Sequence, residues 1–305
     1  MKKLLILSVV IALFLALSPT NNVRAQFIAG SWQSNVSCIN QSEDNDAAVE
    51  LIFYEESTGN KLSLGSEVVP AGKSTNFVLS PSSGSIGSLV IQSNQPLTCA
   101  VDYSAKTTGT SANPYRFAAT KGFDANEISP VMYVSQIEKE FYGWNSYIAV
   151  QNTTDTETDV TISFVDRFTN TYPDLNISIP GFANEVIMLA DVPSLPAMFI
   201  GAATISSDDG ITPLAVSTAF YNAGISPATS QIHAWNGSST GSNTLYAPYI
   251  VMNYYLYNSG IMVQNIGDAP TSFKITYTFA GTDYVYQHPT ELKAGETKDF
   301  YLPNV

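Results

Sequence analysis

The chain offers few residues that could carry out catalysis. It contains only two histidines, His233 and His288, and neither lies beside a recognisable nucleophile motif. Hydrolysis of the Ser-His-Asp or Cys-His kind needs a histidine as its base. The sequence also lacks a phosphate-binding glycine loop, a zinc-protease helix motif and a dinucleotide-binding fingerprint. We therefore predict that the protein is not an enzyme, has no catalytic residues and needs no cofactor.

Acidic residues are the remaining candidates for chemistry. Glu55 with Glu56, and Asp208 with Asp209, could serve glycoside hydrolysis only if two acids flanked a cleft. Their turn-like sequence favours solvated loops. Residues 43–46 offer the oxygen ligands that calcium prefers, but their spacing matches no EF-hand. We predict no metal site, and calcium binding at this turn remains an open alternative.

The elements that would position any site follow an N-terminal targeting sequence. Two lysines precede an apolar run of 14 residues, and a small-residue cleavage site follows at residues 23–25. The run is shorter than the roughly 20 residues that a membrane-spanning helix needs. We expect residues 1–25 to be a signal peptide, and the mature protein to begin at Gln26. The predicted location is extracellular, in solution or at the cell surface, with no membrane span.

The charge of the mature chain excludes one class of partner. Removal of residues 1–25 takes away three of the 13 basic residues and none of the 26 acidic ones, which leaves a formal net charge of −16. Such a surface repels nucleic acid and anionic lipid. We therefore expect no nucleic-acid partner.

The sequence repeats itself, and the repeat predicts the fold. Three segments open with an aromatic residue, alternate apolar and polar side chains, and end in Asn at residues 32–40, 144–152 and 257–265. A polar turn and a second strand of period two follow each opening: Val49, Leu51 and Phe53; Val160, Ile162 and Phe164; Phe273, Ile275 and Tyr277. Short strands separated by Gly, Pro and Asn indicate an all-β protein of tandem antiparallel, Ig-like β-sandwich repeats.

The copies differ in length. Copies one and two continue into two further strands that copy three lacks, and an aromatic-rich segment precedes copies two and three at residues 130–141 and 248–256. Residues 131–141 could form a short helix or a strand, and we predict a strand. The predicted organisation is a signal peptide over residues 1–25 and repeats over residues 26–120, 121–235 and 236–305, the third of them truncated.

The internal alignment predicts a disulfide. Cys38 falls where copies two and three have Val150 and Val263, and Cys99 falls where copy two has Val216. Two changes from an inward-facing valine to cysteine in one copy of an exported protein indicate a bond between its first and last strands. Two buried free thiols are the alternative. A zinc site is excluded because no histidine lies nearby to complete the ligand set.

Aromatic residues raise a second class of function, the binding of carbohydrate. The densest group is Tyr246, Tyr249, Tyr254, Tyr255 and Tyr257, and exposed rings stack on sugars. Trp32, Trp144 and Tyr257, however, occupy one equivalent repeat position. We therefore expect these rings to pack inside the units, and the other tyrosines to fill the interfaces between them. An extracellular glycan is the partner that the alternative implies.

These motifs resemble a known group of repeats. The aromatic-Asn-Ser opening that leads to Val-Gln-Asn, the Ala-Gly turn before a strand, and the Gly-Ser/Ala strand followed by Pro-Leu look like β-sandwich repeats of large secreted surface proteins of filamentous bacteria, notably Chloroflexota. The resemblance covers most of residues 30–305 and implies an exterior location and a scaffold or adhesive role. The chain departs from that group in its small size and in lacking an evident anchoring segment.

We therefore expect a secreted structural or adhesive repeat protein, with a carbohydrate-binding protein as the alternative. Copy three lacks the strand that should pair with its first strand, so we expect an assembly edge at Ile261 and Val263. Its cover is either the chain's own segment 248–256 or a strand of a second molecule, residues 26–30 or an edge of copy one. The second case would produce a homo-oligomer or filament.

Overall fold

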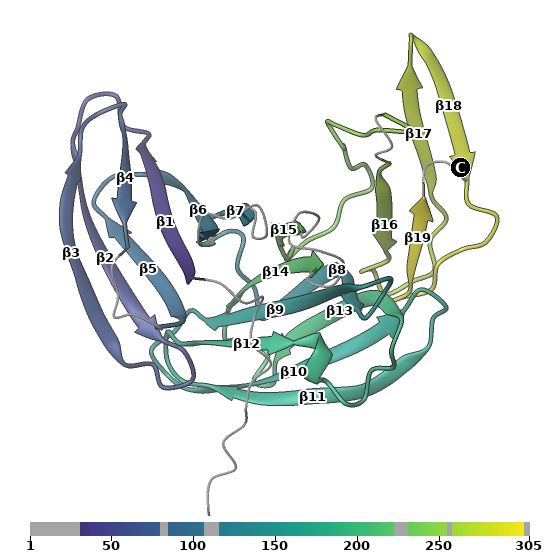
Figure 1. Cartoon of the computed structure of the whole chain (residues 1–305), viewed down its shortest axis with the longest axis horizontal. Helices are drawn as coiled ribbons and strands as arrows, with labels where there is room; N and C mark the ends of the chain where they lie inside the picture. The colour runs from purple at the N-terminus through teal and green to yellow at the C-terminus, as the bar shows by residue number, and fades with distance from the viewer. Residues whose placement is uncertain (1–30, 80–84, 107–115, 223–230, 255–257, 302–305) are drawn as a thin grey trace, which may run out of the picture.

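The computed structural model describes residues 31–79, 85–106, 116–222, 231–254 and 258–301 (Figure 1). The predicted signal peptide, the side chain of Trp32, and Tyr255 and Tyr257 lie outside the described residues. The described part consists of antiparallel β-strands and one short 3-10 turn, η1 (Leu189–Asp191). The prediction of an all-β sandwich fold is confirmed, whereas the boundaries of the repeats stay a prediction.

The first unit is a sandwich of two antiparallel sheets. Its strands are β1 (Ser31–Asn40), β2 (Ala47–Glu55), β3 (Lys61–Val69), β4 (Ser74–Val78), β5 (Gly87–Ser93), β6 (Leu97–Lys106) and β7 (Arg116–Lys121). One sheet has the strand order β4-β1-β6-β7 and the other β3-β2-β5. Val36 and Cys38 of β1 pack with Val49 and Leu51 of β2 in the core between the sheets.

The second unit repeats this strand order and adds one strand. Its strands are β8 (Val131–Lys139), β9 (Trp144–Asn152), β10 (Thr158–Asp166), β11 (Thr171–Ile179), β12 (Asn184–Met188), β13 (Phe199–Ser207), β14 (Leu214–Asn222) and β15 (Gln231–Asn236). The sheets are β12-β9-β14-β15 and β11-β10-β13-β8. Val160, Ile162 and Phe164 alternate with polar residues and are buried, as period two predicts. The strand predicted over residues 131–141 is confirmed as β8.

The third unit is about half as large. Its strands are β16 (Gly260–Gln264), β17 (Lys274–Phe279), β18 (Thr282–Gln287) and β19 (Thr297–Tyr301). They form two separate pairs, β16-β19 and β17-β18. Ile275 and Tyr277 of β17 stay half-buried, although their counterparts in β10, Ile162 and Phe164, are almost completely buried. The described residues thus leave the inner face of the third unit only partly covered.

A buried asparagine lies at the end of β1 and of β9 and directly after β16, and it fixes the turn that follows. The Asn152 amide nitrogen donates to the carbonyl oxygens of Thr156 at 2.6 Å and Ile179 at 3.2 Å. Its Oδ1 accepts from the Thr154 backbone nitrogen at 2.9 Å. Asn40 and Asn265 are buried and make the same three kinds of bond in the other units. One side chain therefore satisfies three backbone groups that the turn would leave unpaired.

The first and second units are joined through the loop around Phe182. Phe182 has a φ of 58°, in the left-handed region where Gly72 and Gly295 lie at the equivalent turns of the other units. Its ring lies 5.0 Å from that of Tyr54 in the first unit, and its carbonyl oxygen accepts a 2.6 Å bond from the Ser88 hydroxyl. We infer that contact with the first unit offsets the backbone strain of this residue.

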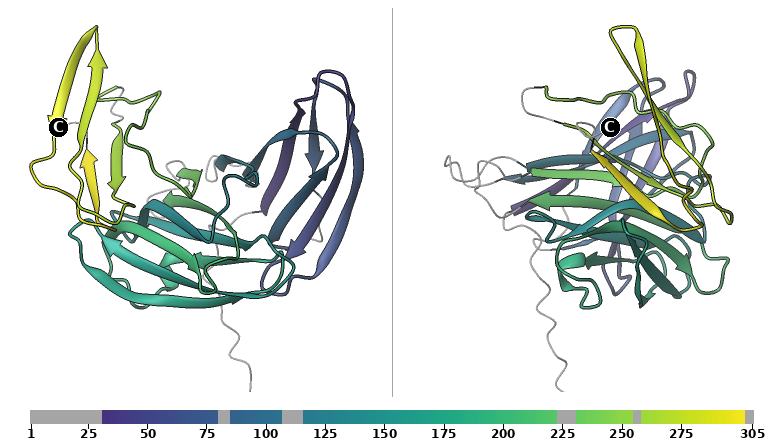
Figure 2. Two further views of the ribbon diagram at one scale, coloured as in Figure 1. Left: turned by 180° about the vertical axis from the view of Figure 1, so that it is seen from behind. Right: turned by 90° about the vertical axis from the view of Figure 1, so that its right-hand side faces the viewer.

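Polar side chains also connect the units. Beside Phe182, the Ser57 hydroxyl donates to the Glu185 carboxylate at 2.6 Å. Between the second and third units, the Arg167 guanidinium forms a 3.1 Å ion pair with Asp299 and lies 4.9 Å from the ring centre of Phe168. The units form an open arc, with the first and third units rising from opposite ends of the second (Figures 1 and 2).

Candidate functional site

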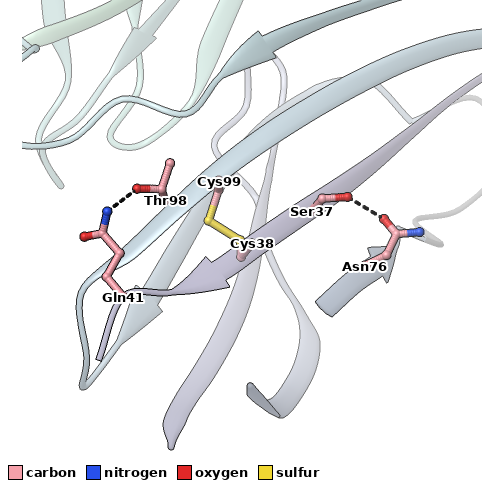
Figure 3. The surroundings of a disulfide bond; sticks show 6 residues. All are labelled: Ser37, Cys38, Gln41, Asn76, Thr98 and Cys99. Atoms are coloured by element: carbon pink, nitrogen blue, oxygen red, sulfur yellow. Dashed lines mark hydrogen bonds between the residues drawn. A yellow bond between two sulfur atoms is a disulfide. The ribbon is translucent and has the colours of Figure 1, made fainter. Parts of the chain in front are cut away.

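The predicted disulfide is present and joins β1 and β6, the two central strands of one sheet. Cys38 of β1 and Cys99 of β6 lie directly opposite each other in the ladder, with their Cα atoms 4.1 Å apart (Figure 3). Cys38 is buried in the core of the first unit. In the second unit the corresponding positions, Val150 and Val216, also lie directly opposite each other. The internal alignment therefore identified a true neighbour pair.

The predicted assembly edge lies on β16. Among the described strands β16 pairs only with β19, whereas β1 and β9 each have a strand on both sides. In the second unit, that additional neighbour is β14, in which residues 214–218 pair with residues 148–152 of β9. Ile261 and Val263 are half-buried.

A polar side chain next to this edge also lacks partners. Both polar atoms of the Gln264 side chain are buried and make no hydrogen bond with the described residues. The equivalent Gln151 donates to the Phe182 carbonyl oxygen at 3.3 Å. Whether Ile261 and Val263 form an interface remains a prediction.

The tyrosine-rich segment before β16 is exposed. Leu245 and Tyr246 are 80% and 89% exposed, and Tyr249, Met252 and Tyr254 are also exposed. The prediction that these tyrosines fill the interfaces between units is therefore wrong for Tyr246, Tyr249 and Tyr254. Large apolar side chains that cluster on a surface are typical of a binding site.

Sequence reasoning missed how closely this segment matches β8. Aligned on the two openings, residues 244–252 correspond to β8 without a gap, with Tyr246 at the place of Tyr133 and Ile250 at that of Ile137. The turn that follows uses the same kind of hydrogen bond. The Val251 backbone nitrogen donates to the Ser259 hydroxyl at 2.9 Å, as the Glu138 backbone nitrogen donates to the Ser146 hydroxyl at 2.8 Å. The signal was available in the shared Asn-Ser of the two openings. Residues 244–252 are thus followed by the same turn as β8, but they do not pair with another strand among the described residues.

The histidines lie among aromatic rings. His233 of β15 is 5.0 Å from the ring of Phe220 and 5.9 Å from that of Trp144, and burial lowers its pKa. His288 stacks on Phe273 at 4.9 Å. Burial, and to a smaller extent the charge of Lys298, lowers the pKa of His288. Both rings contribute to aromatic packing.

The acidic pairs stabilise turns and an interface. Glu55 accepts hydrogen bonds from Asn60 and Thr58 across a turn, and Glu56 accepts from the Val186 backbone nitrogen in the second unit at 3.1 Å. The pKa of Asp209 is lowered, chiefly by the hydrogen bond from the Thr212 hydroxyl. These contacts agree with the predicted turn positions.

The acidic cluster at residues 43–46 also belongs to a turn. The Asp46 carboxylate accepts from the Ala71 backbone nitrogen at 3.0 Å, and the Asn45 backbone nitrogen donates to Ser42. No group of three or more His, Cys, Asp or Glu side chains in the described ranges is arranged to hold a metal ion.

Two shallow grooves lie where the second and third units meet. One, of about 480 Å³, is lined by Phe220, His233 and Trp235 of the second unit and by Met262 of β16. The other, of about 320 Å³, is lined by aromatic and charged residues: Arg167, Phe168, Tyr286, Lys298, Asp299, Phe300 and Tyr301. The first groove is lined by aromatic residues, the type that stacks on sugar rings, and the second combines aromatic rings with two cations.

Within the described residues, no helix has the length and apolar character to cross a membrane. Comparison with known proteins adds no relative: no protein-family model, curated protein or solved structure matches the chain.

Proposed function

We propose that the chain is a secreted structural or adhesive β-repeat protein that assembles with copies of itself at the cell surface. The observation that carries the proposal is the incomplete third unit. Among the described residues, β16 pairs only with β19, and a segment of exposed apolar residues lies beside it in the chain. Proteins rarely leave such edges open, because an unpaired strand edge is a template for pairing with another chain.

The contacts between units support a structural role. Phe182 and Glu185 couple the second unit to the first, and Arg167 couples it to the third. An arc held by such contacts presents its two ends at a set spacing, which a scaffold requires and a flexible string of domains does not provide.

The proposed function is tested on the organism that produces the protein. An antibody against residues 26–305 should label the outer surface of intact cells, and protease treatment of intact cells should remove the label. Label that appears only after the cells are opened would contradict the proposal, whatever the purified protein does in solution.

The binding of carbohydrate is the second candidate, supported by the groove beside Trp235 and Phe220. If polysaccharide stacks there, Trp235→Ala should weaken its binding about tenfold, the loss expected for one aromatic contact. Phe279→Ala, which removes an exposed ring on β17, is the matched control and should bind normally. A glycan array followed by titration of a binding glycan measures both variants. Equal binding by the two variants would exclude this groove.

A further inference from the structure

The second unit shows how a strand such as residues 244–252 is normally covered. There β8 pairs with β13 along the edge of its sheet. Met132 and Val134 of β8 are 0% and 1% exposed, and their partners Ile205 and Ala203 in β13 are 0% exposed. The pairing therefore closes one side of the sandwich core.

The first unit has the counterpart of β13 without the counterpart of β8. In the described residues β5 pairs with β2 alone, and Leu89 and Ile91, which match Ala203 and Ile205, are only partly buried. The chain's own match to β8 would be residues 19–27. That segment has Thr20 and Asn22 where β8 has Met132 and Val134, and most of it belongs to the predicted signal peptide. Unit one therefore has an apolar edge that its own sequence is poorly suited to cover.

The third unit has the opposite deficiency. Residues 244–252 match β8, but the described residues contain no counterpart of β13 in this unit. Leu245 and Tyr246, which match Met132 and Tyr133, are therefore exposed. Each molecule thus carries, in its third unit, a β8-like segment without a β13-like partner. In its first unit it carries β5, a β13-like strand without a β8-like partner among the described residues.

We propose that residues 244–247 of one molecule add as an antiparallel strand to β5 of a second molecule. This inference rests on the proposed function and names the surfaces that would carry out the assembly. The pairing of β8 with β13 sets the register. It places Leu245 opposite Ile91, Tyr246 opposite Val90, and Ala247 opposite Leu89. Main-chain hydrogen bonds would extend the sheet, and Leu245 would enter the partly open core of the first unit.

Pro248 limits the new ladder to four residues. It matches Ser135, which lies at the register shift where β8 skips a pairing with β13, and proline is tolerated in strands at such irregularities. In the second unit β8 leads into β9. In the molecule that supplies β5, the counterpart of β9 is its own β1, which is already in place. The β16 of the molecule that supplies residues 244–247 must therefore stay outside that unit. Pro248 lies where the added strand ends and the chain turns away toward β16 of its own molecule.

The two surfaces differ and lie in different units of the same arc. Their contact is therefore heterologous, and each added molecule presents a fresh residue 244–247 segment or a fresh β5 edge. Contacts of this kind produce open-ended chains unless the rotation between molecules closes a ring.

Cysteine cross-linking tests the register. Val90→Cys and Tyr246→Cys are made separately in residues 26–305, one of them labelled with 15N, mixed and oxidised mildly. A disulfide between residue 90 of one isotope and residue 246 of the other is expected from peptide mapping. The control pairs Val90→Cys with Tyr284→Cys, which offers a surface tyrosine of β18 and should give only background cross-linking.

A second variant measures the apolar contribution. Leu245→Asp should abolish the larger species in sedimentation, while leaving the unfolding curve unchanged because Leu245 is 80% exposed in the single molecule. Larger species that persist with this variant, together with a 90–246 cross-link no stronger than the control, would overturn the strand-addition site and leave surface assembly by another route. A wild-type protein that stays monomeric at every concentration would overturn the strand addition as well, even if antibody labelling places the protein on the cell surface.

Discussion

Replacing Cys38 and Cys99 together by valine is expected to lower the free energy of unfolding of the first unit by about 4 kcal/mol. The two cysteines are 61 residues apart, and the chain-entropy model relates the stabilisation to that loop length. Valine is the appropriate replacement because Val150 and Val216 fill the equivalent opposed positions in the second unit. The substitution therefore removes the covalent link and keeps an apolar pair between the sheets.

Hydrogen exchange of the amides in β1 and β6 measures this effect within the first unit. Oxidised wild-type protein should protect these amides far more strongly than the double variant. Wild-type protein in a reducing agent should approach the variant, and the variant itself should not respond to the reducing agent. Equal protection in the oxidised wild type and the variant would show that the bond contributes nothing to stability.

Asn152→Leu is expected to destabilise the second unit by about 3 kcal/mol or more, because each buried polar group left unpaired costs about 1–3 kcal/mol. The substitution keeps the approximate size of the side chain and removes its bonds to Thr156, Ile179 and the Thr154 backbone nitrogen. Ile179 is 0% exposed, as Asn152 is, so its carbonyl oxygen would be left unpaired away from water, and the bonds at Thr154 and Thr156 in the more open turn would be lost in addition.

Asn176→Leu provides the matched control, because Asn176 of β11 is exposed and accepts a single hydrogen bond from Thr161. Its effect should stay within about 0.5 kcal/mol, as is usual for surface positions. Urea unfolding of both variants shows whether the buried Asn152 contributes more to stability than the exposed Asn176. If Asn152→Leu and Asn176→Leu shifted the transition equally, the turn-fixing role of the buried asparagine would be wrong.

The alternation of apolar and polar residues and the internal repeat account for the parts of the fold that the sequence could predict. Alternation in residues 160–164 identified a half-buried strand because strand side chains point to opposite faces in turn. The comparison of copies then identified Cys38 and Cys99 as neighbours, since a position shared by two copies occupies the same place in both folds. The repeated asparagine was visible too, but its three hydrogen bonds depend on turns that lie up to 29 residues away.

The exposed tyrosines could not be assigned from sequence because burial depends on the partner. Tyr133 and Tyr246 have the same residue type and the same place in the repeat, yet Tyr133 lies beside β13 and Tyr246 has no such neighbour in its unit. A single strand is not stable by itself in water. Residues 244–252 therefore form no strand in the single molecule, although their sequence matches one that does.

Negative-stain electron microscopy of purified residues 26–305 over a range of concentrations tests the central claim most directly. Self-assembly through the open third unit predicts linear chains that lengthen as the protein concentration rises and that disappear with Leu245→Asp. Dispersed single arcs at every concentration would contradict it.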